Sequence, residues 1–322
     1  MIRRIVVCLL MTALLLTVSL AQGQQTKKVP HIGYLTSSGR ASFEAFATAL
    51  RQLGYVEGKS VIFEFRTTEN TTQLQPELAA ELTQLKVDLI VAVGAGAIRA
   101  AQNATSTIPI VMSEVNDPIA LGFVASLAHP GANITGMSNL SPELSGKRLE
   151  LIKEVVPKTS RIAVLAYRGE AMRSSIKETD VAAQSLGLQV QLLNVKAPDE
   201  IESALDAAKK QRADALVQIQ AAFFNSHQQR IIELATKNRL PAMYNSRIDV
   251  EAGGLMSYGY DTVERNQRVA FLVDKILKGA KPADLPVEQP MKFDFVINLK
   301  AAKQIGLTIP PNVLARADRV IR

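Results

Sequence analysis

Residue types that could perform catalysis are sparse in this chain of 322 residues. Glu114 and Asp117 lie in the stretch "IPIVMSEVNDP" and could act as a carboxylate pair, one as acid and one as base. Ser174 and Lys177 have the spacing of a serine nucleophile with a lysine base on one helix face. No S-D-N or K-T-G motif, metal cluster or phosphate loop accompanies either pair. We therefore interpret Ser174 and Lys177 as a solvated helix face, and Glu114 as a surface charge.

The other polar residues of this stretch suit ligand binding better than catalysis. Asp117 stands directly before Pro118, which is typical of a helix start whose carboxylate caps a backbone N–H group. Asn116 and Ser113 are then free to face a ligand. We predict that Asn116 lines a binding cleft and that Asp117 starts the following helix beside it.

A second candidate is the stretch "VGAGAIRAA", in which Gly94 and Ala95 follow an apolar run. Gly94 and Gly96 resemble the first two glycines of a dinucleotide loop, but Arg99 stands where the third belongs. Small residues still let the backbone N–H groups of a helix start contact a carboxylate or another polar group. We predict a small-residue ligand loop here and no cofactor.

The elements that must position these residues follow an α/β alternation. Strands are predicted over residues 29–35, 60–66, 87–93 and 108–115, with amphipathic helices between them. After the polar segment 137–147 the alternation restarts, with strands over 161–167, 188–195, 214–220, 240–245 and 293–299 and a long helix ending at Asn238. This pattern predicts the fold class α/β, with two doubly wound parallel-sheet lobes joined by crossover hinges.

Two such lobes leave a cleft between them. The predicted lobes comprise residues 29–138 with 259–284, and residues 142–257 with 290–322. Ligands of open parallel sheets bind outside the carboxyl ends of the strands, so the residues that follow each strand form the predicted site. These ligand-binding residues are Thr36, Ser37, Gly94, Ala95, Asn116, Asp117, Arg168, Gln220 and Tyr244.

The amino-terminal segment predicts export. Two arginines precede an uninterrupted apolar run, and small residues follow at Ser19, Ala21 and Gly23. This is typical of a signal peptide over residues 1–23. A membrane anchor is the alternative, but the apolar run is short for a span and polar residues follow it at once. Cys8, the sole cysteine, lies inside the signal, so the mature chain forms no disulfide and suits the bacterial periplasm.

Charge and histidine content exclude other classes. Removing Arg3 and Arg4 with the signal lowers the formal charge from +7 to +5, and the remaining basic residues are scattered among acidic ones. We therefore expect no nucleic-acid partner. The three histidines lack metal-ligand spacing, so we predict no metal site. We expect a monomer.

Long motifs in several places resemble one family. The stretch "KGAKPADLPVEQPMKFDFVINLKAAKQIGLTIPPNVLARADRVIR" resembles the terminal signature of substrate-binding proteins of bacterial ABC transporters, often labelled tryptophan/tyrosine-type. The resemblance extends to "LRQLGYVEGKSVIFEFR", "IPIVMSEVNDPIALGFVASLAHPGANITGMSNL" and "LPAMYNSRIDVEAGGLMSYGYD", and so covers essentially the whole mature chain. It implies a type I periplasmic binding protein with three crossovers, which closes on a small solute and serves an ABC permease.

The resemblance also implies positions for the site. The family's polar turn falls on residues 115–118 and its small-residue loop on residues 94–97. Its second-lobe aromatic position falls on Tyr244, and its crossover motif on Ser257, Tyr258, Gly259 and Asp261. Tyr258 and Asp261 therefore join the predicted ligand-binding residues.

This chain departs from the family pattern at two places that are expected to line the cleft. Asn116 replaces a threonine, and Tyr167 with Arg168 replaces an asparagine-proline pair. A guanidinium at a strand end binds a carboxylate through two parallel hydrogen bonds, whereas the alternative for Arg168 is a surface salt bridge. The ligand can therefore differ from that of other members.

Three functions remain open from the sequence. The first is a periplasmic solute receptor of an ABC importer, without enzymatic activity, for an amino acid or related carboxylate. The second is a sensory module that presents a solute to a receptor. The third is a secreted hydrolase that uses Glu114 or Ser174.

Overall fold

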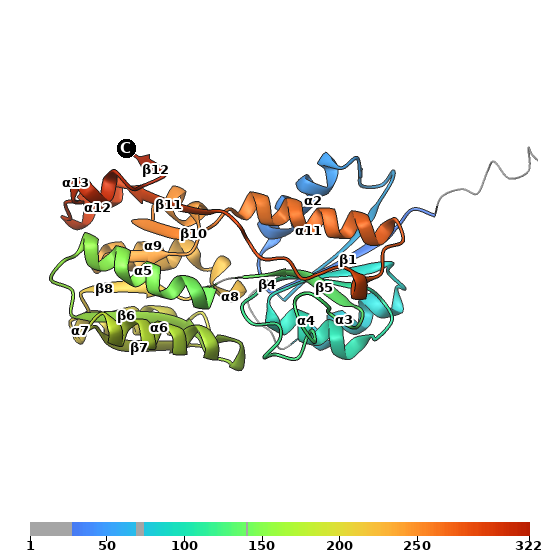
Figure 1. Ribbon diagram of the computed structural model, residues 1–322, viewed down its shortest axis with the longest axis horizontal. Coiled ribbons are helices and arrows are strands. Elements are labelled where there is room, and N and C mark those ends of the chain that lie inside the picture. Colours follow the sequence, from blue (N-terminus) through green and yellow to red (C-terminus); the bar gives the residue numbers. More distant parts are fainter. Residues whose placement is uncertain (1–27, 69–73, 140) are drawn as a thin grey trace, which may run out of the picture.

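Two α/β lobes lie side by side along the long axis of the molecule (Figure 1). The structure, a computed structural model, describes residues 28–68, 74–139 and 141–322. The predicted signal peptide, residues 1–23, lies outside the described residues. Within the described part of the chain, no helix is both long and apolar enough to cross a membrane.

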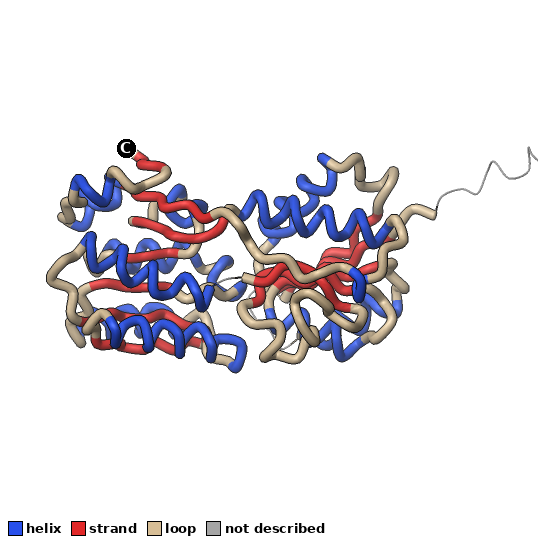
Figure 2. The backbone as a smooth tube through the Cα atoms, viewed as in Figure 1, coloured by secondary structure: helices blue, strands red, loops and turns tan. Residues whose placement is uncertain are grey.

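The first lobe is built on a five-stranded parallel sheet with the order β2-β1-β3-β4-β5. Its strands are β1 (His31–Thr36), β2 (Ile62–Thr67), β3 (Leu89–Val93), β4 (Ile110–Val115) and β5 (Ile134–Ser138). Helices α2 (Arg40–Gln52) and α11 (Thr262–Leu277) cover one face, and α3 (Gln75–Gln84) and α4 (Ala95–Ala104) cover the other (Figure 2). The 3-10 turn η2 (Pro282–Asp284) packs beside β5.

The second lobe contains a seven-stranded sheet with the order β12-β11-β10-β9-β8-β6-β7. Its strands are β6 (Arg161–Tyr167), β7 (Gln189–Val195), β8 (Ala215–Gln218), β9 (Ala242–Tyr244), β10 (Met256–Tyr260), β11 (Phe293–Asn298) and β12 (Arg319–Ile321). Only β10 and β11 pair antiparallel among the described strands. The helical segments are α5 (Ser141–Val155), η1 (Glu170–Met172), α6 (Arg173–Ser185), α7 (Glu200–Lys210), α8 (Ala222–Asn225), α9 (Gln228–Lys237), α10 (Arg247–Glu251), α12 (Leu299–Ile305) and α13 (Pro311–Leu314). The predicted fold class is confirmed.

Hydrophobic patterning explains where each element lies. Strands β3 and β4 are buried along their whole length, as expected for the interior of a parallel sheet covered on both faces. Strand β7, at the edge of its sheet, instead mixes exposed and buried residues. On α2, Phe43, Phe46 and Leu50 form the buried stripe at helical spacing. In each sheet the parallel strands point the same way, so their carboxyl ends lie along one edge of the sheet.

Two predicted helices differ from the structure. Residues after Pro118 form turns rather than a helix, because Gly122 takes a left-handed conformation (φ 67°) after a single turn. Asp117 Oδ1 still accepts the N–H of Ala120 at 3.0 Å, so it caps that turn. The predicted long helix ending at Asn238 is divided into α8 and α9 by a turn at Ser226 and His227.

The chain crosses between the lobes after β5, between β10 and α11, and after η2. Gly259 and Tyr260, which the sequence assigned to the first lobe, are the last residues of β10 in the second sheet. A Cβ on Gly259 would stand 1.7 Å from the backbone oxygen of Asn245, so only glycine fits there. The strand therefore continues to the crossover itself.

Asp249, in the capping box of α10, should make stability depend on pH. Its carboxylate accepts the N–H of Ser246 at 3.1 Å, and burial raises its pKa from 3.8 to about 7. Because the folded pKa exceeds the unfolded value, the folded state favours protonated Asp249. The contribution of Asp249 to stability is therefore complete below about pH 4 and is lost as the pH rises through about 7. We expect Asp249→Asn, which keeps the acceptor oxygen, to flatten the decline. Urea unfolding of the wild-type and Asp249→Asn proteins across that pH range measures how the free energy of unfolding declines. The same decline in both proteins would contradict this role of Asp249.

Candidate functional site

The carboxyl ends of the two sheets meet at a lobe junction where the lobes bond directly. We define this junction by residues 36–39, 94 and 114–116 of the first lobe and residues 220–226 of the second. Asn116 Nδ2 donates to the backbone oxygen of Gln220 at 3.3 Å. Ser38 Oγ donates to the backbone oxygen of Ala222 at 3.2 Å. These two hydrogen bonds join the strand ends of the two lobes directly.

Helix α8 brings the second lobe into this junction (Figure 1). It follows β8 closely, and its residues Phe223 and Phe224 are buried in the core of the second lobe. Ala222 faces Gly94, where a Cβ would stand 2.9 Å from the Cβ of Ala222. Gly94 also has a φ of 88°, which glycine adopts without strain. The predicted small-residue loop therefore permits close approach of the opposite lobe.

Six of the predicted ligand-binding residues lie at or beside the junction: Thr36, Ser37, Gly94, Ala95, Asn116 and Gln220. Thr36 Oγ1 accepts the N–H of Ser38 at 2.9 Å and so shapes the turn after β1. The backbone oxygen of Ser37 accepts a bond from Ser226 Oγ at 3.4 Å. These contacts place the predicted residues together, while their contact with a solute stays a prediction.

The structure places Arg168 and Tyr244 elsewhere. The exposed Arg168 guanidinium donates to the backbone oxygen of Asn194 on the edge strand β7, at 3.3 Å. Tyr244 was expected to face the cleft, but its side chain is 1% exposed and belongs to the core of the second lobe. The reason is that β9 lies inside the sheet between β8 and β10. Burial accordingly raises the pKa of Tyr244 above its usual range.

Tyr258 and Asp261 lie at the crossover between β10 and α11. The Tyr258 ring stacks on Phe293 with centroids 6.3 Å apart, and its backbone oxygen accepts a bond from Arg148 Nε at 2.8 Å. Asp261 Oδ1 accepts the N–H of Val263 at 2.7 Å and so caps α11. Both residues therefore have structural contacts that hold the crossover.

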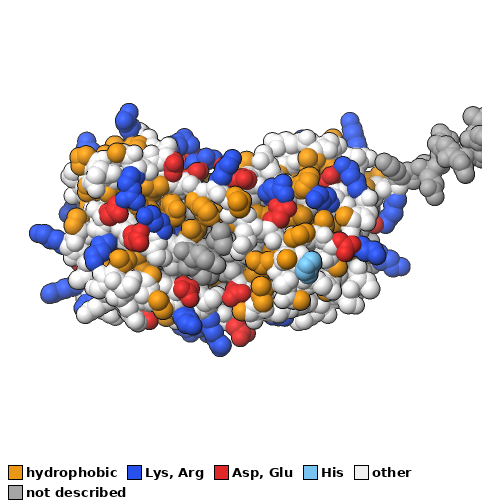
Figure 3. Space-filling view, in the orientation of Figure 1, with side chains coloured by type: hydrophobic (Ala, Val, Ile, Leu, Met, Phe, Trp, Pro, Cys, Tyr) orange, Lys and Arg blue, Asp and Glu red, His pale blue; other side chains and the backbone are white. Residues whose placement is uncertain are grey.

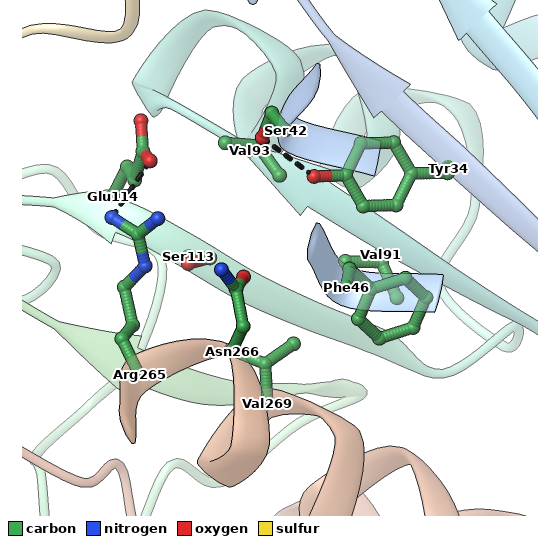
Figure 4. A pocket seen from close by; sticks show the side chains of 10 residues that line it. All are labelled: Tyr34, Ser42, Phe46, Val91, Val93, Ser113, Glu114, Arg265, Asn266 and Val269. Atoms are coloured by element: carbon green, nitrogen blue, oxygen red, sulfur yellow. Dashed lines mark hydrogen bonds and ion pairs between the residues drawn. The ribbon is translucent and has the colours of Figure 1, made fainter. Parts of the chain in front are cut away.

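Glu114 is buried and is not the surface charge that the sequence indicated. Its side chain is 3% exposed, and its Oε1 lies 2.7 Å from Nη1 of Arg265, whose side chain is 7% exposed (Figure 4). Burial alone lowers the pKa of Arg265, but the Glu114 carboxylate raises it on balance. Asn225 Nδ2 of the second lobe donates to Glu114 Oε2 at 3.0 Å. The expectation failed because Arg265 is remote in the sequence.

A β-bulge in β4 aims the Glu114 side chain. The pairing with β5 shifts register between Met112 and Val115, and Glu114 has a left-handed φ of 56°. Opposite the bulge, a Cβ on Gly136 would stand 2.1 Å from the backbone oxygen of Met112. Bulges re-aim side chains near functional sites, and a non-glycine residue at this φ stores strain. Gly136 therefore permits the bulge that turns Glu114 toward Arg265.

Two cavities lie near the junction and the crossovers. The first is too narrow to admit a water molecule and is lined by the ten residues in Figure 4. The second has room of about 430 Å³ for water-sized spheres and lies at the crossovers. It is lined by Met137, Asp261, Glu264, Arg265, Arg268, Glu288, Gln289, Pro290 and Met291. Arg268 and Glu288 form two hydrogen bonds of 2.6 Å there, which tie α11 to the third crossover.

Buried acceptor oxygens without a partner mark the strand ends of the second lobe. Gln220 Oε1 and Asn245 Oδ1 have no hydrogen-bond partner among the described residues, although both side chains are buried. They follow β8 and β9, which are neighbours in the sheet. A buried polar atom without a partner is costly and calls for an explanation such as a ligand or a water. These two oxygens are the acceptors that a bound donor would satisfy.

The structure gives less support to a serine nucleophile at Ser174, to an anion site at the start of α4 or to a metal site. Ser174 and Lys177 lie on α6, and the Lys177 side chain is exposed, as expected of a solvated helix face. At the start of α4, Gln75 Oε1 would stand 2.4 Å from a Cβ on Gly96, so a side-chain oxygen already faces that helix start. The described part of the chain contains no cluster of three or more metal-ligating side chains.

Sequence reasoning missed three residues of the junction, Ser38, Asn225 and Ser226, and also Arg265, which bonds Glu114 of the junction. Ser226 Oγ accepts the N–H of Gly39 at 3.1 Å and so joins the lobes beside α8. Ser38 lies just after β1, and Asn225 and Ser226 lie at the end of the short helix that follows β8, so their closeness to strand ends could have indicated them. Arg265 lies on α11, soon after β10, but no local pattern signals its pairing with Glu114, which is remote in the sequence.

The comparisons with known proteins agree on one family. The profile of the family described as ABC transporter substrate binding protein matches residues 37–321. The Tyrosine-binding protein of Clostridioides difficile (strain R20291) is 27% identical over 267 residues, which cover 82% of this chain and 76% of the relative.

Two solved structures share the fold over 91% of this chain. An ABC domain from Streptococcus pneumonia in complex with L-Trp is 28% identical, with a TM-score of 0.83 and 99% of that chain covered. The ligand-free, open structure of a substrate binding protein with adhesive properties from Clostridium difficile is 25% identical, with a TM-score of 0.63 and 99% covered. The chain therefore belongs to the ABC transporter substrate binding protein family and has its two-lobed type I periplasmic binding fold.

Proposed function

We propose that this protein is the periplasmic solute receptor of an ABC importer and closes its lobes on an amino acid or related carboxylate. The observation that carries this proposal is the pair of unpartnered acceptors, Gln220 Oε1 and Asn245 Oδ1, at neighbouring strand ends. An ammonium group supplies several N–H donors, which are the kind of partner that both oxygens lack. The Tyrosine-binding protein and the L-Trp complex support the amino-acid class.

The arrangement of the lobes supports a closing mechanism. The chain superposes with a TM-score of 0.83 on the L-Trp complex but only 0.63 on the ligand-free open relative, although the sequence identities are 28% and 25%. Direct hydrogen bonds between the lobes accompany this arrangement. We infer that the closed form is the one that a membrane permease would recognise.

The proposed binding surface combines both lobes. The first lobe would contribute Ser37, the loop at Gly94 and Ala95, and Asn116, and closure would add Gln220. Binding of this kind requires no covalent chemistry, and the receptor would act as an exported monomer. Acidic and basic side chains are interspersed on the face in Figure 3, which supports a small solute over a nucleic acid as partner there.

Thermal denaturation of the mature protein with L-tryptophan, L-tyrosine, L-leucine and aromatic acids tests the proposal. A solute at about 100 times its Kd should stabilise the fold by about 2.7 kcal/mol and raise the Tm. Asn116→Ala should weaken binding about tenfold by removing a buried hydrogen-bonding group at the junction. Arg168→Ala should leave affinity unchanged, since its guanidinium bonds to the edge strand. If none of these solutes shifts the Tm, the amino-acid receptor is the wrong assignment.

A further inference from the structure

An ion pair of the first lobe reaches across the junction to the second lobe. Glu114 Oε1 bonds Arg265 within the first lobe, and Glu114 Oε2 accepts Asn225 Nδ2 from α8 of the second lobe at 3.0 Å. Asn225 Nδ2 also donates to Ser38 Oγ at 3.2 Å. One side-chain amide therefore bonds two groups of the opposite lobe, and one of them is charged.

The burial of this ion pair makes the contribution of Asn225 conditional on lobe closure. Two charges removed from water are compensated only when their remaining hydrogen-bonding positions are also satisfied. Glu114 and Arg265 are both nearly inaccessible here. Asn225 satisfies the second carboxylate oxygen only while the lobes are together, and water would have to replace it when they separate. The contact therefore favours the closed form specifically.

The same network continues toward the crossover. Arg265 Nη1 donates to the hydroxyl of Tyr260 at 3.1 Å. Tyr260 is the last residue of β10, directly before the chain crosses to α11. The strained backbone at Glu114 holds the carboxylate between these partners. A continuous set of bonds thus runs from α8 through Glu114 and Arg265 to the crossover.

We propose that Glu114, Arg265 and Asn225 form an inter-lobe latch that sets solute affinity by stabilising the closed lobes, without touching the solute. Asn225 is then a positioning residue, because it changes the population of the closed form and not the solute contacts. Apparent affinity scales with the population of the binding-competent form. The inference rests on the proposed function only in taking lobe closure as part of solute binding.

Disulfide trapping tests the latch without any solute. Gly39→Cys with Ser226→Cys, in a Cys8→Ser background, places two thiols across the junction, where Ser226 Oγ accepts the N–H of Gly39 at 3.1 Å. A Cβ on Gly39 would meet no other atom within 4 Å, so the new side chain fits, and a disulfide forms only while the two lobes are in contact. Adding Asn225→Ala should slow crosslinking about tenfold or more, since a hydrogen bond to a charged group is lost. Asn225→Asp should slow it further, because it places a second carboxylate against Glu114.

Asn238→Ala is the matched control. Asn238 Nδ2 bonds Leu205 and Asp206 within the second lobe, at 3.5 and 3.4 Å, so its loss should leave the crosslinking rate unchanged. Crosslinking of the Asn225→Ala protein at the unmodified rate would overturn the latch. If the two cysteine substitutions prevent folding, small-angle scattering of Asn225→Ala and wild-type protein decides instead, with a larger radius of gyration expected for Asn225→Ala.

A binding measurement separates this inference from the proposed function. Calorimetry with L-tryptophan and L-tyrosine should give a Kd about tenfold higher for Asn225→Ala than for wild type and Asn238→Ala. Slower crosslinking without binding of any amino acid would retain the latch and refute the amino-acid receptor. Binding with equal Kd for all three proteins, together with equal crosslinking rates, would retain the receptor and refute the latch.

Discussion

Replacing Glu114 with alanine is expected to lower the free energy of unfolding by about 3 to 5 kcal/mol. The substitution leaves the guanidinium of Arg265 buried without its carboxylate, since the Arg265 side chain is only 7% exposed. Breaking a buried pair from one side costs more than the pair contributes, because the remaining charge keeps its desolvation penalty. It also removes the acceptor for Asn225. Chemical denaturation of wild-type and variant proteins gives the difference.

An exposed ion pair of the same length provides the control. Glu202 Oε2 lies 2.7 Å from Arg230 Nη2, but the side chains are 46% and 53% exposed. Glu202→Ala should therefore cost less than about 1 kcal/mol. Glu114→Gln, which retains a side-chain oxygen without the charge, should fall between the two. A cost for Glu114→Ala no greater than that of the control would show that Arg265 finds another partner or reaches solvent.

Gly136→Ala is expected to destabilise the first lobe by about 3 to 5 kcal/mol, as the sum of overpacking and backbone strain. The new Cβ would stand 2.1 Å from the oxygen and 2.6 Å from the nitrogen of Met112, both backbone atoms that cannot rotate away. Gly136 also has a φ of 144°, which side chains other than glycine rarely adopt. The strands β4 and β5 would have to separate or the bulge would have to disappear.

Gly146→Ala on α5 is the corresponding control, because its new Cβ would meet only the Cβ of Ala182, at 3.8 Å. Alanine is the better helix former, so this variant should be as stable as wild type or up to about 1 kcal/mol more stable. Thermal and urea unfolding measure both variants. Equal stability of the Gly136→Ala and Gly146→Ala proteins would mean that the bulge at Glu114 can be rebuilt without loss.

The effects expected for Glu114→Ala and Gly136→Ala arise from one connected set of residues. Gly136 admits the bulge, the bulge turns Glu114 toward Arg265, and that pair receives Asn225 from the opposite lobe. Strain and buried charge both lower the stability of the first lobe, which is why such features cluster at sites with a function. Asn225 adds its bond to the pair only when the second lobe is in contact. Stability and lobe closure are therefore coupled through these four residues.

Much of the fold is predictable from local pattern. The apolar runs that became β3 and β4 and the stripe of Phe43, Phe46 and Leu50 on α2 follow directly from the periods of strands and helices. Local pattern failed at Pro118, where Gly122 ended the expected helix after a single turn. It failed again at α8, where the turn at Ser226 and His227 interrupts an otherwise helical run. Single residues at element ends override periodicity.

The sequence by itself determined the two α/β lobes, the row of strand ends and the presence of Asn116 and Gln220 in that row, because these depend on short-range spacing. Only the tertiary structure decided that Glu114 is buried against Arg265, that Asn225 bonds it from the other lobe, and that Tyr244 lies in the core. Those outcomes depend on how the crossovers bring α11 and α8 against β4. Contacts between segments remote in the sequence leave no periodic signal, so their physical basis is visible only once the lobes are packed.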